Sequence, residues 1–163
     1  MPLVPSINQA VVGNHTIFYR EAGHPSAPTV LLFHGFPSSS HQYRNLIPIL
    51  ALFYHVIAPD FPGFGFTNSP SSFSHTFANI ATVMGDFLDV VGVKKFAMYV
   101  FDYGAPVGLR LALERPGDVT AIVSQNGNAY VEGLGAFWDQ FKPYWKTGSE
   151  AYGFSSYQES IDR

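Results

Sequence analysis

Short apolar runs alternate with segments of helical spacing along most of this 163-residue chain. Runs too short for an independent helix predict strands at residues 10–13, 15–21, 29–33, 55–58, 96–101 and 119–123, after a polar lead-in over residues 1–9. Helical spacing predicts helices over residues 42–53, over 77–91, and from 105 until Arg115 and Pro116. This order predicts an α/β fold, a mostly parallel sheet with helices on both faces.

Residues 95–116 combine a strand, a turn that carries one acid, and a helix. The apolar run 96–101 is typical of a parallel strand that is covered on both faces. Asp102 follows this run directly, and such a turn lies at the sheet edge where open α/β proteins bind ligands. The positive end of the following helix would favour an ionised carboxylate, which is a plausible nucleophile. The alternative is that Asp102 simply caps that helix.

Composition narrows the classes of function. Hydrophobic residues make up 47% of the chain and charged residues 13%, which indicates a folded globular protein. The net charge of -3 gives no reason to expect nucleic acid as a partner. The absence of cysteine excludes disulfides and thiolate metal sites, and the six histidines lack the spacing of metal ligands. We expect neither a metal nor a cofactor.

The ends of the chain carry different signals. The first residues lack the pattern of a signal peptide, and no apolar run approaches the ~20 residues of a membrane-spanning helix. We therefore expect a soluble cytoplasmic protein without a membrane partner. Residues 129–163 are rich in aromatic side chains, and Trp138, Phe141 and Trp145 are spaced as on an amphipathic helix. We interpret residues 1–128 as a core domain and 129–163 as the beginning of a helical cap, although this helix could instead pack on the main sheet.

Three motifs in order along the chain carry a resemblance to a known family. His34-Gly35-Phe36-Pro37 follows one predicted strand, Asp-Phe-Pro-Gly-Phe-Gly at residues 60–65 follows the next, and Asp102 forms a strand-to-helix elbow. Together they resemble the α/β-hydrolase fold, and more narrowly its aspartate-nucleophile branch of epoxide hydrolases and haloalkane dehalogenases. The resemblance covers about residues 10–145. Val100 departs from the general pattern, which has a small residue two places before the nucleophile.

The resemblance implies a mechanism and a set of site residues. Asp102 would attack a small apolar substrate, either opening an epoxide or expelling halide, and would carry the resulting ester. The backbone N–H groups of Phe36 and Tyr103 would stabilise the oxyanion that forms when water attacks that ester. These two positions usually hold Asn and Trp in dehalogenases, so the resemblance leans toward epoxide hydrolases. Residues expected to contact substrate are His34, Pro37, Tyr130, Trp138 and Tyr144.

Some of these residues also have simpler interpretations. His34 is expected to form structural hydrogen bonds beneath the oxyanion turn, and Asp60 to order its own Pro-Gly turn. Tyrosines of the cap act as acids in epoxide-opening relatives, but most tyrosines of residues 129–163 can equally be packing residues.

The resemblance also exposes a missing part. The family places its general-base histidine and the acid partner of that histidine after the cap, whereas the last histidine of this chain is His75. The sequence therefore resembles the N-terminal half of an α/β-hydrolase, with residues 119–123 as an open sheet edge. Two interpretations follow. The chain carries the nucleophile of a hydrolase whose base comes from a missing segment or a second chain. Alternatively, it is a truncated, non-catalytic protein that binds a partner, or a second copy of itself, through the open edge.

Overall fold

The computed structural model describes residues 4–143 of the chain. The packing of the backbone separates two compact units, Met1–Gly127 and Asn128–Arg163. The first unit contains the sheet and the three motifs, so it positions the candidate site.

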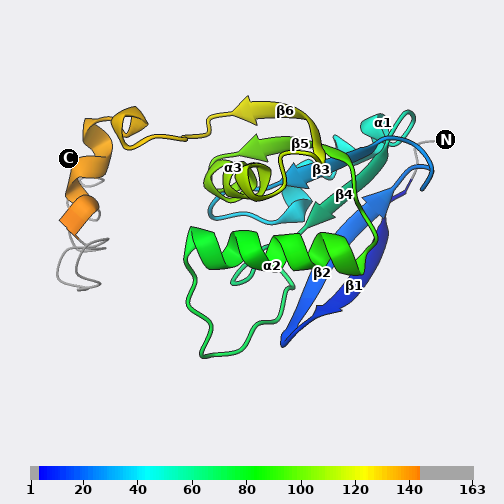
Figure 1. The fold of residues 1–163 in the computed structure, drawn as a ribbon, viewed down its shortest axis with the longest axis horizontal. Helices are drawn as coiled ribbons and strands as arrows, with labels where there is room; N and C mark the ends of the chain where they lie inside the picture. Colours follow the sequence, from blue (N-terminus) through cyan, green and yellow to red (C-terminus); the bar gives the residue numbers. More distant parts are fainter. Residues whose placement is uncertain (1–3, 144–163) are drawn as a thin grey trace. The chain divides into compact units, whose positions relative to one another are not determined.

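A six-stranded sheet forms the centre of the first unit (Figure 1). The strands lie in the order β1-β2-β4-β3-β5-β6. Strand β2 runs antiparallel to both of its neighbours, whereas β3, β4, β5 and β6 are mutually parallel. The strand bounds are β1 Ser6–Val12, β2 His15–Ala22, β3 Thr29–Phe33, β4 His55–Pro59, β5 Phe96–Phe101 and β6 Val119–Gln125. This architecture confirms the predicted fold class.

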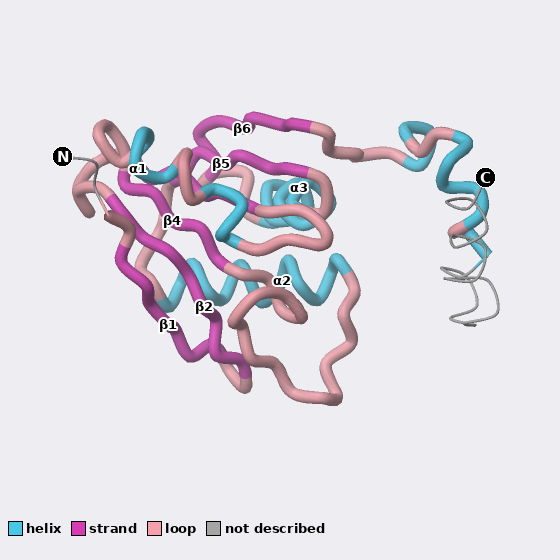
Figure 2. The backbone as a smooth tube through the Cα atoms, turned by 180° about the vertical axis from the view of Figure 1, so that it is seen from behind, coloured by secondary structure: helices cyan, strands magenta, loops and turns pink. Residues whose placement is uncertain are grey.

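Two long helices cover one face of this sheet. Helix α2 (Phe77–Val90) and helix α3 (Gly104–Glu114) lie in front of the strands in Figure 1 and behind them in Figure 2. Helix α2 begins where the Thr76 hydroxyl accepts a hydrogen bond from the Asn79 N–H, which satisfies one of the free donors of the first turn. Pro106 lies in the first turn of α3, where a missing N–H has no cost.

Alternation along the strands builds two apolar clusters. Leu31 and Phe33 of β3 pack with α2 and α3 in the main core, and both are fully buried. Leu32, between them, points to the other face and packs with Tyr43 and Ile47. That second cluster is smaller, because a 3-10 helix (Ser40–Tyr43) and the four-residue helix α1 (Ile47–Leu50) provide its cover.

Two predicted elements differ from the structure. The lead-in is shorter than predicted, because β1 already begins at Ser6 and pairs with Glu21 of β2. The predicted helix over residues 42–53 is broken into the 3-10 helix and α1. Pro48 explains the break, because proline cannot donate the hydrogen bond that would continue a helix from upstream.

Strand β5 has no exposed residue, but its two faces are covered unequally. Phe96, Met98 and Val100 are buried, whereas the alternate residues Ala97 and Tyr99 are only partly buried. The less buried face of β5 is the one that packs with the smaller apolar cluster. Strand β6 is exposed from its second residue to its last.

In the part of the second unit that the structure describes, short 3-10 helices span Val131–Gly133 and Ala136–Gln140, and residues 142–143 are helical. Trp138 lies in the second of these 3-10 helices and Phe141 follows it, with their ring centres 5.7 Å apart, so the described residues contain only part of the predicted amphipathic helix. Trp145 lies outside the described residues. The assignment of this unit as a cap stays a prediction.

None of the helices within residues 4–143 is long and apolar enough to cross a membrane.

A bidentate ion pair between Arg115 and Asp89 joins the C-terminal ends of α2 and α3. Arg115 Nη1 and Nη2 lie 2.7 and 2.6 Å from the two carboxylate oxygens of Asp89. We expect Arg115→Gln to lower the free energy of unfolding at pH 7 by at most about 1 kcal/mol, because the Asp89 side chain is exposed and the Arg115 side chain is only partly buried. Urea unfolding measures this difference, and Lys94→Gln, at an exposed lysine between α2 and β5, is the control that also removes one positive charge.

The same pair predicts a pH dependence. Hydrogen bonds from Arg115 lower the pKa of Asp89 in the folded chain. The stabilisation is therefore complete above the unfolded carboxyl value of about 3.9, and is lost as the pH falls through the lower folded pKa. Wild type and Arg115→Gln should converge in stability at strongly acidic pH. A difference that persists unchanged there would show that the pair is not its source.

Candidate active site

Asp102 occupies a sharp elbow between β5 and α3. Its φ of 50° lies in the left-handed region, which is uncommon for a residue other than glycine and is often found at functional sites. The elbow is held by close packing: a Cβ on Gly104 would lie 2.3 Å from the carbonyl oxygen of Phe33. The start of α3 can therefore approach the end of β3 only with glycine at this position.

Val100 departs from the usual elbow pattern, and Gly108 of α3 makes room for it. It stands two residues before Asp102 and is fully buried. A Cβ on Gly108 of α3 would lie 2.6 Å from Val100 Cγ1. The chain thus places the small residue on the helix instead of on the strand, which allows the same close approach.

The Asp102 carboxylate is bonded across the sheet edge. The Phe36 N–H donates to Asp102 Oδ1 over 2.7 Å. Beside this contact, a Cβ on Gly35 would lie 2.6 Å from Asp102 Cβ, so the turn after β3 lies directly against the elbow. The structure therefore brings together two of the predicted site residues from different strands.

The capping alternative for Asp102 is wrong. The N-cap position of α3 is Tyr103, and no side chain caps the helix there. The N–H of Ala105 bonds to the main-chain carbonyl of Asp102 and not to its carboxylate. The carboxylate is directed to the Phe36 N–H instead.

His34 supports the turn from below. Its side chain is fully buried, and Nε2 accepts a hydrogen bond of 3.1 Å from the Phe61 N–H. Nδ1 therefore carries the proton and donates to the Gly35 carbonyl, 3.0 Å away. Burial lowers the pKa of His34 below the ordinary imidazole value of about 6.5, so the ring is neutral at pH 7. These contacts favour the structural interpretation of His34 over direct contact with substrate.

Asp60 connects the two loops that flank the elbow. The carboxylate is 1% exposed, with Oδ1 accepting from the Ser40 N–H over 2.7 Å and Oδ2 from the Phe66 N–H over 2.9 Å. The bond to Phe66 confirms that Asp60 orders its own turn. The bond to Ser40 was not foreseen, nor was that of 3.3 Å from the Gly35 N–H to Gln42 Oε1. Neither Ser40 nor Gln42 belongs to a motif that could have signalled it.

Aromatic rings gather beside the elbow. The Phe36 ring is 55% exposed and its centre lies 5.4 Å from that of Tyr103. Phe64 and Phe77 lie against the Tyr103 ring, at 6.3 and 4.9 Å. Pro37, the next residue of the turn, is also exposed. An apolar molecule that approaches Asp102 would meet these side chains.

Three predicted substrate contacts stay predictions. Tyr130 is 75% exposed and Trp138 is partly buried, but both belong to the second unit. Tyr144 lies outside the described residues. The role of the Tyr103 N–H as second oxyanion donor likewise stays a prediction.

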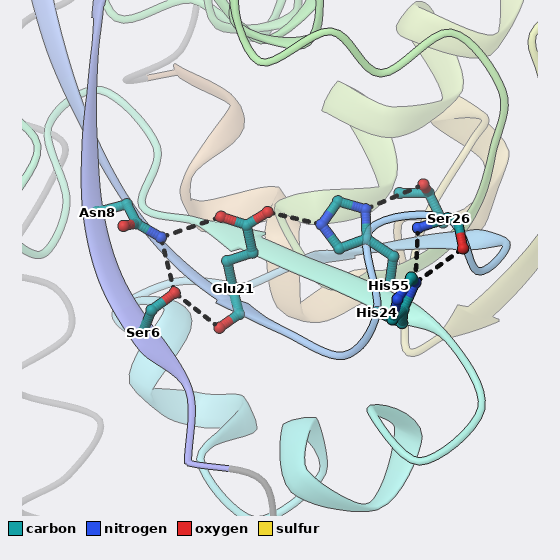
Figure 3. Close-up of polar contacts among 7 residues, drawn as sticks. Ser6, Asn8, Glu21, His24, Ser26 and His55 are labelled. Carbon is teal, nitrogen blue, oxygen red and sulfur yellow. Dashed lines mark hydrogen bonds and ion pairs between the residues drawn. The ribbon is translucent and has the colours of Figure 1, made fainter.

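A histidine–carboxylate pair occurs elsewhere in the first unit (Figure 3). His55 Nε2 lies 2.6 Å from Glu21 Oε1, and Glu21 also accepts from Asn8. His55 begins β4, whereas Asp102 follows the end of the parallel strand β5. The pair therefore lies at the opposite edge of the sheet and cannot act as a base for an ester on Asp102.

A surface cavity of about 530 Å³ also lies apart from the elbow. The β1–β2 turn, residues 70–74 and helix α2 line it, and His15 and Asp86 are among its polar side chains. None of its lining residues belongs to the elbow or the turn after β3. Within the described part of the chain, His, Asp and Glu side chains form no group of three that could hold a metal ion.

Comparisons with known proteins agree with this geometry. Residues 28–153 match the model of a family described as the alpha/beta hydrolase fold. The chain is 55% identical over 132 residues to an uncharacterized hydrolase of Saccharomyces cerevisiae, which covers 80% of this chain and 46% of that protein. It is 34% identical over 139 residues to a haloalkane dehalogenase of Mesorhizobium japonicum, covering 84% of this chain and 42% of that enzyme.

Comparison with solved structures also finds an enzyme of this kind. A crystal structure of an epoxide hydrolase from Vigna radiata superposes with a TM-score of 0.69 and 31% identity, covering 74% of this chain and 39% of that one. The chain thus spans less than half the length of these relatives.

The buried position of His34 predicts both a loss of stability and a pH dependence. We expect His34→Leu to lower the free energy of unfolding by about 1–3 kcal/mol at pH 7, because the Phe61 N–H and the Gly35 carbonyl lose their partners. In the wild type the folded pKa lies below the unfolded one. The His34 contribution is therefore complete above about pH 6.5 and declines as the pH falls below it.

Denaturant unfolding between pH 5 and 8 measures this effect. The gap between wild type and His34→Leu should be largest above pH 6.5 and should narrow toward pH 5. His24→Leu, at an exposed histidine, should show little effect. Equal stability of wild type and His34→Leu at all pH values would contradict the structural role of His34.

Proposed function

The chain belongs to the alpha/beta hydrolase fold family, and from this premise we propose that it carries the nucleophile of an epoxide-hydrolase-like enzyme. The observation behind this proposal is the hydrogen bond from the Phe36 N–H to Asp102 Oδ1 at a left-handed elbow. It holds one carboxylate oxygen at the turn and leaves the other, Oδ2, to react.

The proposed reaction has two steps. Asp102 Oδ2 forms a bond to an epoxide carbon while the ring C–O bond breaks, and the released alkoxide takes a proton from water. The product is a hydroxyalkyl ester on Asp102. Water would then attack the ester carbonyl, and the negative charge that develops on Oδ1 would be stabilised by the Phe36 N–H, with the Tyr103 N–H as the expected second donor.

The side chains near the nucleophile favour an epoxide over an alkyl halide. An epoxide oxygen stays attached to the substrate and is neutralised by a proton, whereas a departing halide needs hydrogen-bond donors at the site. The positions that usually supply such donors in dehalogenases hold Phe36 and Tyr103 here. Haloalkane dehalogenases are nevertheless among the relatives, so halide displacement is the alternative reaction for the same nucleophile.

The second step needs a general base, and the histidine that the resembled branch places after the cap has no counterpart after Asp102 in this sequence. His75 is the last histidine, and His34 is buried with both ring nitrogens bonded. The base would have to come from a further segment or from a second chain. On this proposal the 163-residue chain alone performs the first step and retains the ester.

Because the chain alone is proposed to form the ester and not to hydrolyse it, the ester itself can be detected. The purified chain, incubated with a reactive epoxide, should gain the mass of one substrate molecule as measured by intact mass spectrometry. Asp102→Asn should gain none, because a neutral amide oxygen is a much weaker nucleophile. Asp86→Asn, which removes an exposed carboxylate on α2, is the matched control and should react like the wild type. An adduct on Asp102→Asn, or none on a folded wild type, would contradict the proposed nucleophile.

Strand β6 favours a second candidate function, in which the chain binds another strand. Within residues 4–143, β6 pairs with β5 on one side and with no strand on the other. Its sequence Val-Thr-Ala-Ile-Val-Ser-Gln contains no charge, although charged residues are a common protection of exposed edges. Ile122 and Val123 are 42% and 56% exposed. Such an edge can accept a strand from a second copy or from a complementing chain.

Self-association measures this candidate. We expect the wild type to form dimers as its concentration rises in analytical ultracentrifugation. Ile122→Lys should shift the equilibrium toward monomer, because lysines of the two copies would repel each other where their β6 strands pair. Ile49→Lys, at an exposed isoleucine of α1, is the matched control and should leave dimers unchanged. A chain that stays monomeric at every concentration would exclude the second copy as the partner.

A further inference from the structure

Four aromatic side chains from separate segments meet beside Asp102. They are Phe36 from the turn after β3, Phe64 from the loop after β4, Phe77 from the start of α2, and Tyr103 from the elbow. Phe36 lies edge-on to Phe64 at 6.2 Å and tilted against Tyr103 at 5.4 Å. Tyr103 lies edge-on to Phe64 and to Phe77, at 6.3 and 4.9 Å. We call this set the aromatic cluster.

Core packing accounts for only part of the aromatic cluster, because Phe64 and Phe77 pack against the main core whereas Phe36 and Tyr103 belong to neither apolar cluster. Phe33 and Phe61 nearby show what core aromatics look like in this fold, with exposures of 0% and 1%. Phe36 is 55% exposed, and the other three rings are only partly buried. A group of rings that keeps apolar surface in contact with water is more typical of a ligand-binding surface than of a core.

The aromatic cluster is tied to the reactive carboxylate through the backbone. The N–H of Phe36 donates to Asp102 Oδ1, and Tyr103 directly follows Asp102. A group attached to the carbon that Asp102 attacks would therefore lie against the rings of these two residues. Aromatic groups gain attraction in such edge-on and offset contacts beyond what their buried area provides.

Charge near the aromatic cluster limits the substrate further. The charge closest to the attacked carbon is the Asp102 carboxylate itself, which repels an anion. The Arg110 guanidinium lies 5.9 Å from the Phe77 ring centre and donates to the Pro106 carbonyl. This cation is thus engaged with a ring and a carbonyl of the protein.

We propose that the aromatic cluster determines specificity, and that the substrate is a neutral epoxide with an aryl group next to the reacting ring. This inference rests on the proposed function of Asp102. The covalent step is unchanged: Oδ2 bonds to the epoxide carbon, the ring C–O bond breaks, and the oxygen takes a proton from water. The aryl group stacks on Phe36 and Tyr103 while this occurs.

The test compares two epoxides that differ in the ring alone. (2,3-Epoxypropyl)benzene and (2,3-epoxypropyl)cyclohexane have the same reactive group, separated from the ring by a methylene, so their intrinsic reactivities match. We expect the wild-type chain to form the Asp102 adduct roughly three- to tenfold faster with the aryl compound, the range that corresponds to an aromatic contact. The rate is followed by intact mass, and circular dichroism verifies that each variant is folded.

Variants assign the preference to the aromatic cluster. Phe36→Leu and Phe64→Leu should bring the ratio of the two rates close to one. Phe53→Leu, at an exposed ring of the turn after α1, should keep the wild-type ratio. The anionic 4-(2,3-epoxypropyl)benzoate should react more slowly than the unsubstituted aryl epoxide, and an equal rate would overturn the requirement for a neutral substrate.

The outcomes separate this inference from the proposed function. Adducts that form at equal rates with both rings would overturn the aryl preference and leave the nucleophile in place. A preference that survives in both Phe36→Leu and Phe64→Leu would show that the aromatic cluster is not its source. Absence of any adduct on a folded wild-type chain would overturn the proposed function itself.

Discussion

The hydrogen bond between the Phe36 N–H and the Asp102 carboxylate is the contact on which the site depends. It exists because β3 and β5 are adjacent and parallel, with Phe33 opposite Val100, so both strands end at the same level. The turn after β3 then faces the elbow after β5. Three glycines make the approach possible: a side chain on Gly35, Gly104 or Gly108 would meet the elbow or its neighbouring strands at less than a normal contact distance.

Buried polar groups hold the two loops around that contact. Asp60 and His34 are almost fully buried, and each bonds to backbone groups of both the segment after β3 and the segment after β4. A buried polar group is costly when it is unpaired, so these bonds resist any arrangement that breaks one of them. The strained conformation of Asp102 is thereby fixed by its surroundings. A rigid carboxylate beside a backbone donor is what nucleophilic attack, and later charge stabilisation on Oδ1, require.

Sequence reasoning reached the elbow because it rests on strong local signals. The apolar runs at residues 29–33 and 96–101 are strands in the structure, and a residue that directly follows a parallel strand must lie at the carboxyl edge of the sheet. Contacts that depend on strand register, such as Ser40 with Asp60, have no local signal. Sequence reasoning missed the start of β1 because residues 6–9 are mostly polar, and an edge strand that is largely exposed can carry polar residues on both faces. The cap of residues 129–163 depends on chain that lies partly outside the described residues.

The most direct measurement is the nuclear magnetic resonance signal of the Phe36 amide at pH 7 in the wild type and in Asp102→Asn. The structure predicts that the amide proton signal moves upfield in the variant, because the hydrogen bond weakens when its acceptor loses its charge. The amide signals of residues far from the elbow should keep their positions. A Phe36 amide signal that is the same in both proteins would contradict the contact on which the site is built.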